Sequence, residues 1–212
     1  MARLILAIVL TAVLAACQTG SQPVIVPTPS PSPTPHSTAT TSILQSPEVP
    51  SGLTVCLGSG PIDVFIAALS QADATIGTRA SDHWHQLKLQ GARDGAISLF
   101  AANTSACNAD LGATSNVKAI VSFVARFDDS GQAHRAWEAG LFGFAPPPPG
   151  QIVTGVTGGT TTGLGLSSFT YERPSVRLAS WQRSVFVALL VASNLDAGTF
   201  KTAATTIDAR LN

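Results

Sequence analysis

Residues 117–127, VKAIVSFVARF, decide the fold class. Their β-branched and aromatic side chains predict a strand, and apolar side chains fall on both of its alternating faces. Residues 128–131, Asp-Asp-Ser-Gly, then turn the chain, and apolar residues recur at helical spacing through residues 132–142. The segment therefore predicts a sheet strand that leads into a helix.

Further elements surround this unit. Strands are predicted at residues 86–89, 96–101, 166–171, 175–181 and 184–192. The last two are joined tightly at Gln182-Arg183, which predicts an antiparallel hairpin. Helices are predicted at residues 60–72, capped by Ser59, and after a cap at Asn194 or Asp196. We therefore expect an α+β fold: an antiparallel or mixed sheet with helices packed on one face, forming a single domain.

The first residues have the layout of a secretory signal. Arg3 supplies one positive charge, and residues 4–16, LILAIVLTAVLAA, are uncharged and mostly apolar. A transmembrane anchor is the alternative, but it needs about 20 apolar residues, and the apolar stretch ends at Gln18. We therefore expect residues 1–16 to be a signal peptide.

The apolar stretch closes on Leu14-Ala15-Ala16-Cys17, which resembles the lipobox of bacterial lipoproteins. The resemblance implies cleavage before Cys17 and lipid, such as palmitate, on that cysteine. Each buried CH₂ contributes ~0.8 kcal/mol, so two or three acyl chains hold firmly. An ordinary signal cut near the same place is the alternative. We expect a membrane-anchored, extracytoplasmic protein at the cell surface or in the periplasm.

Residues 18–50 differ in composition from the rest of the chain. They are rich in proline, serine and threonine, include the tract PTPSPSPTP at 27–35, and carry Glu48 as their one charged residue. This composition buries too little apolar surface to offset the entropy of folding. With the lipidated Cys17, residues 17–50 are expected to be a disordered tether, and residues 51–212 to be the globular domain.

The charge balance excludes one class of partner. The chain has 12 basic and 12 acidic residues and no run of Lys or Arg. Phosphate binding depends on clustered positive charge. Nucleic acid is therefore not expected as a partner.

Two cysteines remain after Cys17. In an oxidising compartment Cys56 and Cys107 form an even pair. A metal pair or a reactive thiol is the alternative, but the spacing is not C-x-x-C. We expect a structural disulfide.

The domain loosely resembles the extracellular sensor domains of bacterial Ser/Thr kinases and their free-standing lipoprotein relatives. The likeness lies in the paired cysteines, the strand at 117–127 with its Ala-rich helix, and the terminal hairpin and helix at 175–211. Such relatives often have a Gly-Asn turn where this chain has Gln182-Arg183. The resemblance implies a similar fold and a sensing or binding role, with no residue carried over.

His83 and His85 are the weak candidates for a metal site. On a strand, residues two apart share a face, so both imidazoles could reach one zinc or copper ion. His134 and Glu138 lie one helical turn apart and could join only if the fold brought them near. The alternative is a solvated loop with Trp84 packed on the surface. Without a third ligand, neither a metal nor another cofactor is expected.

Catalytic motifs are missing from the sequence. It contains no G-x-S-x-G, and its Gly-rich stretch GVTGGTTTGLG lacks the ending of a phosphate loop. Phe142 and Phe144, before four prolines, instead suggest a cleft wall or a contact patch for a membrane or a partner protein, or else a loop folded over the core. We expect no enzyme, but a ligand-binding or sensor-like domain for a small apolar molecule. The alternative is an interaction module that docks an envelope protein without a pocket.

Overall fold

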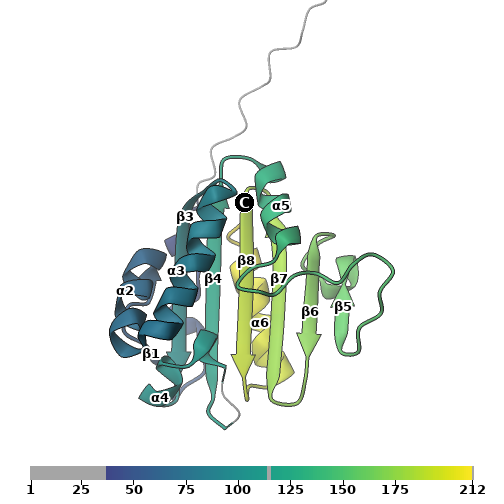
Figure 1. Ribbon diagram of the computed structural model, residues 1–212. Helices are drawn as coiled ribbons and strands as arrows, with labels where there is room; N and C mark the ends of the chain where they lie inside the picture. Colours follow the sequence, from purple (N-terminus) through teal and green to yellow (C-terminus); the bar gives the residue numbers. More distant parts are fainter. Residues whose placement is uncertain (1–36, 114–115, 212) are drawn as a thin grey trace, which may run out of the picture. The chain divides into compact units, whose positions relative to one another are not determined.

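An antiparallel sheet of eight strands lies between helices on its two faces (Figure 1). The structure is a computed structural model, and it describes residues 37–113 and 116–211. The expected signal peptide, Cys17 and the first part of the expected tether lie outside the described residues. Within the described ranges, no helix is long and apolar enough to cross a bilayer. The predicted α+β class is confirmed.

The sheet has the strand order β1-β3-β4-β8-β7-β6-β5, with β2 also paired to β3, and every pair is antiparallel. The strands are β1 (Thr54–Val55), β2 (Gly60–Pro61), β3 (Ala92–Ala101), β4 (Ala119–Phe127), β5 (Val156–Gly158), β6 (Ser168–Glu172), β7 (Val176–Arg183) and β8 (Phe186–Ser193).

Six α-helices and three short 3₁₀ turns are described. The helices are α1 (Ala39–Ser42), α2 (Ile62–Ala72), α3 (Ala74–Leu89), α4 (Thr104–Cys107), α5 (Ser130–Ala139) and α6 (Ala197–Asp208). The 3₁₀ turns are η1 (Ser46–Glu48), η2 (Asp110–Gly112) and η3 (Gly159–Thr162).

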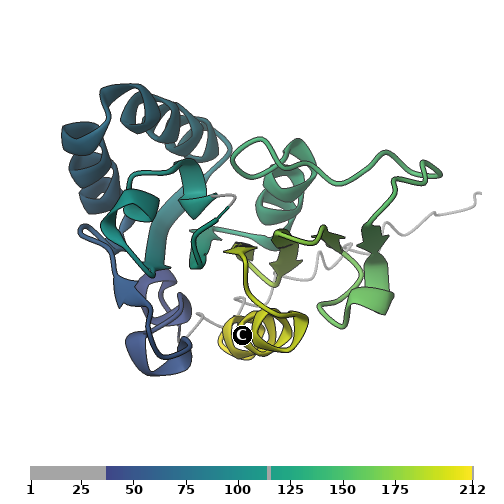
Figure 2. The ribbon, with the colours of Figure 1, turned by 90° about the horizontal axis from the view of Figure 1, so that it is seen from below.

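Strand β4 is buried on both faces, as its sequence requires. Val121 and Phe123 belong to the core that packs against α2, α3 and α5. Ile120 and Val124 belong to the core that packs against α1 and α6. The helices therefore cover both faces of the sheet, and not one face as expected. Figure 2 shows α2, α3 and α5 on one side of the strands and α6 on the other.

The strand predicted at residues 86–89 is wrong, because these residues end helix α3. Asp73 caps this helix by accepting hydrogen bonds from the N–H groups of Thr75 and Ile76. Trp84 and Leu87, three residues apart, are its buried contacts with the sheet. The polar–apolar alternation around them fits either structure, and the cap and length of the helix decide between the two.

The other predicted elements are present with shifted ends. The first predicted helix begins at Ile62, and Pro61 rather than Ser59 occupies its N-cap. In the last hairpin, Arg183 pairs with Phe186, so the turn lies at Ser184-Val185 instead of Gln182-Arg183. Ser184 has a φ of 52°, a left-handed conformation typical of tight two-residue turns.

Residues 37–50 are part of the fold, so the expected tether of residues 17–50 is too long. We call this segment the N-terminal strap. Ala39, Ile43 and Leu44 are buried in the core beside α6. The Leu44 N–H donates to Ser122 Oγ (2.9 Å), and the Ala39 N–H donates to Asp94 Oδ2 (3.0 Å). Burial of these apolar residues stabilises the folded strap. The overall composition of residues 18–50 does not reveal them, because proline, serine and threonine dominate it.

Candidate functional site

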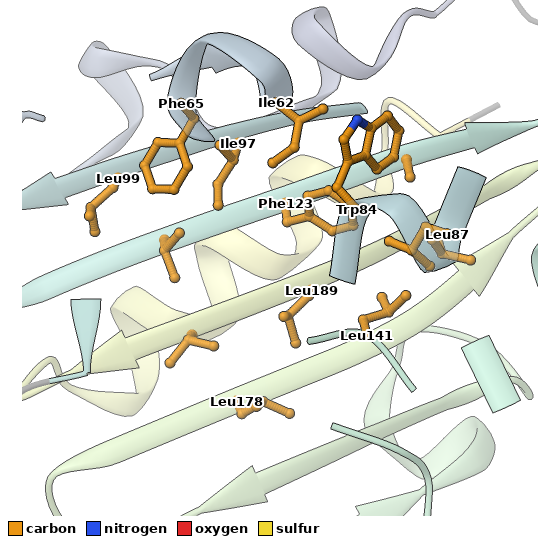
Figure 3. Packing of buried hydrophobic residues seen from close by; sticks show 14 of the residues in the cluster. Ile62, Phe65, Trp84, Leu87, Ile97, Leu99, Phe123, Leu141, Leu178 and Leu189 are labelled. Atoms are coloured by element: carbon orange, nitrogen blue, oxygen red, sulfur yellow. The ribbon is translucent and has the colours of Figure 1, made fainter. Parts of the chain in front are cut away.

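A cleft of about 340 Å³ opens on the face of the sheet that carries α2, α3 and α5. Its floor comes from two neighbouring strands: Val176 and Leu178 of β7 and Val191 of β8 line it. Phe65 of α2 and His83 of α3 line one side. Figure 3 shows Phe65 packed over the neighbouring part of the sheet, with Leu178 lying farther along the same face.

The opposite wall is the turn that follows α5. Gly140 has a φ of 96° and ends the helix earlier than the expected residue 142. Leu141 and Phe144 then exchange backbone hydrogen bonds (3.1 and 2.9 Å), with Leu141 fully buried as the anchor. Phe142 and Phe144 both line the cleft. The structure therefore brings the two predicted apolar residues together at one site.

Phe142 is held by two aromatic contacts. Its ring meets Phe123 of β4 edge-on, with 4.9 Å between centroids. Its centroid also lies 5.5 Å from that of the His83 imidazole. Because aromatic pairs of this geometry add to the energy of simple burial, the wall is fixed rather than loose.

The rim of the cleft is polar. Arg79 of α3 pairs with Asp110 of η2 at 3.3 Å, and both side chains are more than half exposed. An exposed pair of this kind contributes only about 0–1 kcal/mol. Tyr171, which also lines the cleft, accepts a hydrogen bond from Arg173 (2.7 Å) through its hydroxyl. An apolar interior with polar groups at the edge is typical of small-molecule sites.

The apolar floor continues past Phe144 under the proline loop. A second hollow of about 480 Å³ shares Phe144, Tyr171 and Leu178 with the cleft and adds Val153 and Phe169. The two hollows are therefore neighbours that share these three side chains.

The weak metal candidates, His83 and His85, do not form a site. Both lie in α3 and not on a strand, so positions two apart point in nearly opposite directions. His83 faces Phe142, and His85 is exposed. Within residues 37–113 and 116–211, no group of three His, Cys, Asp or Glu side chains could hold a metal ion.

A contact that the sequence did not predict joins three polar side chains elsewhere on the surface. His134 of α5 lies 3.3 Å from Glu138 and 3.3 Å from Ser167 Oγ. A hydroxyl, an imidazole and a carboxylate in this order are the groups of nucleophilic catalysis. Here the imidazole is 43% and the carboxylate 59% exposed, and the three groups lie outside the lining of the cleft. His134 and Glu138 are one helical turn apart, whereas Ser167 is 33 positions from His134 and no motif marks it.

The disulfide anchors the segment that leads into one edge of the cleft. Cys56 and Cys107 are bonded, with 5.5 Å between their Cα atoms, as predicted. Cys107 ends α4, directly before the turn that carries Asp110 and Leu111 of the cleft. The bond also indicates that the protein folds in an oxidising, extracytoplasmic compartment.

Comparisons with known protein families, with curated proteins and with solved structures found no match to this chain.

Proposed function

We propose that this chain is a cell-envelope lipoprotein whose domain binds a small apolar ligand without catalysis, as a carrier or sensor. The observation that carries the proposal is the cleft between Phe142 and α3, with Leu178 at its floor. Its volume of about 340 Å³ lies within the range of about 300–1,000 Å³ common for ligand sites.

The chemistry of the lining defines the ligand. Apolar floor and wall residues favour a ligand whose body is hydrocarbon or aromatic. The Arg79–Asp110 pair and the Tyr171 hydroxyl at the edge favour a single polar end that stays near water.

Membrane attachment through lipid on Cys17 is the second part of the proposal. The extracytoplasmic compartment indicated by the disulfide agrees with export, and the lipobox supplies the anchor. Replacing Cys17→Ser in the full chain should move the protein from the membrane fraction to the soluble fraction. A variant that still sediments with membranes as the wild type does would count against the anchor.

A narrowed cleft tests ligand binding directly. Ala80 lines the cleft from α3, so Ala80→Leu should fill part of it while leucine still favours the helix. The neutral fluorophore N-phenyl-1-naphthylamine should bind residues 37–212 about tenfold more weakly after this change. Ala74→Leu, the same substitution at an exposed position of α3, is the matched control and should leave binding unchanged.

A domain that does not bind the fluorophore, or binds it equally in all three forms, contradicts the proposal. Native mass spectrometry of the gently purified domain gives an independent reading, because a retained ligand adds mass that denaturation removes.

The second candidate is a module that docks an envelope protein. It is favoured by Phe144, whose side chain is 39% exposed at the mouth of the cleft. A domain that binds no fluorophore, but whose Phe144→Ser variant loses its attachment to other envelope proteins, would support this candidate instead.

A further inference from the structure

One end of the sheet is built from a segment without charge. Residues 139–171, between Glu138 and Glu172, contain no Asp, Glu, Lys, Arg or His. They form the turn after α5, the proline loop, β5, η3 and most of β6. The surface that these residues themselves present therefore carries no charge, and charged side chains of other elements, such as Arg183 beside Gly165, adjoin it.

Large apolar side chains are exposed on this surface. Ile152 is 99% exposed and Leu166 is 79% exposed, and both line one shallow hollow beside residues 146–149. Phe144 and Val153 of the same segment are also exposed. Exposed apolar residues that cluster in this way usually mark a contact surface.

The polar groups of the segment are unusually easy to remove from water. Residues 146–149 are four prolines, whose nitrogens carry no N–H to leave unpaired. The hydroxyls of Thr161 and Thr162 donate to the carbonyls of Gly158 and Gly159 (2.8 and 3.0 Å), so they are satisfied within the turn. Covering these groups with hydrocarbon would leave none of them unpaired, and Gln151 is the amide side chain in the lining of the hollow.

The absence of charge favours a lipid surface over a protein. Protein interfaces usually carry a polar, charged rim and are enriched in Arg. Apolar side chains that insert at a bilayer interface are stabilised by about 0.8 kcal/mol per buried CH₂ and need no charged partner. The lining of the hollow that holds Ile152 and Leu166 includes no Lys or Arg that could select anionic lipids.

We propose that the charge-free surface of residues 139–171 inserts Ile152 and Leu166 into the uncharged interface of a lipid bilayer. The contact is made by the domain itself and is independent of the acyl anchor on Cys17. The two side chains that insert, Ile152 and Leu166, do not line the cleft, so replacing them leaves the lining of the proposed ligand site unchanged.

The test uses residues 37–212, which contain both cores and all eight strands and lack the anchor and the signal segment. The oxidised domain is floated with phosphatidylcholine vesicles at low and at high salt. We expect binding that is nearly independent of salt. Replacing Ile152→Ser and Leu166→Ser together should weaken it about tenfold or more, since both side chains leave the hydrocarbon.

The matched control replaces Leu57→Ser and Leu89→Ser, which are 86% and 68% exposed but lie outside the segment. This control should bind as the unchanged domain does. Because all four positions are exposed, both double variants should fold, which their circular dichroism can verify. The proposal is overturned if the domain does not float, if both variants lose binding equally, or if high salt abolishes the binding.

Discussion

Phe142 and Phe123 meet edge to face, with 82° between their ring planes. Phe142 holds this position although its φ of 50° lies in the left-handed region, which disfavours a side chain with a Cβ. The contact with β4 therefore holds the turn after α5 in a strained conformation, and this turn is the wall of the proposed ligand site.

Two substitutions at Phe142 should distinguish the stability contributed by its ring contacts from the cost of its left-handed backbone conformation. Phe142→Ala removes the ring contacts and should lower the free energy of unfolding by about 1–3 kcal/mol, with weaker binding of the fluorophore. Phe142→Gly loses the same ring but relieves the left-handed strain, so it should be about 1 kcal/mol more stable than Phe142→Ala. Urea titrations measure both. Equal stability of the two variants would mean that residue 142 is not left-handed in solution.

Removal of the disulfide should destabilise the domain without changing its fold. The bond joins residues separated by 51 positions, and closing a loop of this length contributes about 4 kcal/mol on the chain-entropy model. The double variant Cys56→Ala, Cys107→Ala should lose about that much in denaturant unfolding. Dithiothreitol should bring the wild type close to the variant and leave the variant itself unaffected. If the reductant also destabilised the variant, the loss of stability in the wild type could not be assigned to the disulfide.

The N-terminal strap should be required for stability. Leu44→Ala should lower the free energy of unfolding by about 2–4 kcal/mol, because the side chain is buried beside α6. A domain that begins at residue 51 should lose more, since it also loses Ile43 and the hydrogen bond from the Leu44 N–H to Ser122 Oγ. Ser46→Ala, at an exposed strap position, is the control and should change little. If the domain from residue 51 proved as stable as the one from residue 37, the strap would be dispensable.

Asp196 should make the domain sensitive to acid. The Thr199 backbone N–H donates to its carboxylate at the start of α6, and this hydrogen bond lowers the pKa of Asp196 below its ordinary value of 3.8. A lowered folded-state pKa adds stability that is present above the unfolded pKa and is lost as the pH falls through the folded pKa. Asp196→Asn keeps a capping oxygen but cannot titrate. The variant should lose less stability than the wild type between neutral pH and pH values below 3.8; an equal loss would assign the acid sensitivity to other groups.

The sequence predicts the centre of the fold better than its edges. Strand β4 and the β7–β8 hairpin are predictable because continuous apolar runs of this length fit few other structures. The structure of residues 82–89 is not predictable in this way, because their alternation suits a strand as well as the buried face of a helix. Only the distant cap at Asp73 distinguishes the helix from the strand. The strap is mispredicted for a related reason: its three buried apolar residues lie in a segment whose composition is typical of disorder.

The candidate site is only partly visible in the sequence. Phe142 and Phe144 are conspicuous because they stand before four prolines, and the structure brings both to the cleft. Leu178 and Val191 of the floor look like any other strand residues. Their role depends on the region of the sheet left open between α3 and the turn after α5, which sequence patterns do not encode. The contact of Ser167 with His134 likewise depends on the packing of α5 against β6.

Arg210 closes the chain on itself. Its guanidinium donates to the carbonyl of Ile43 (3.1 Å) and to the carboxylate of Glu48, so the first and last segments of the domain lie against each other. With the two ends this close, a short linker could join them, and new ends could be opened at the exposed Ser184 turn. The domain is thus suited to circular permutation, with both hydrophobic cores left intact.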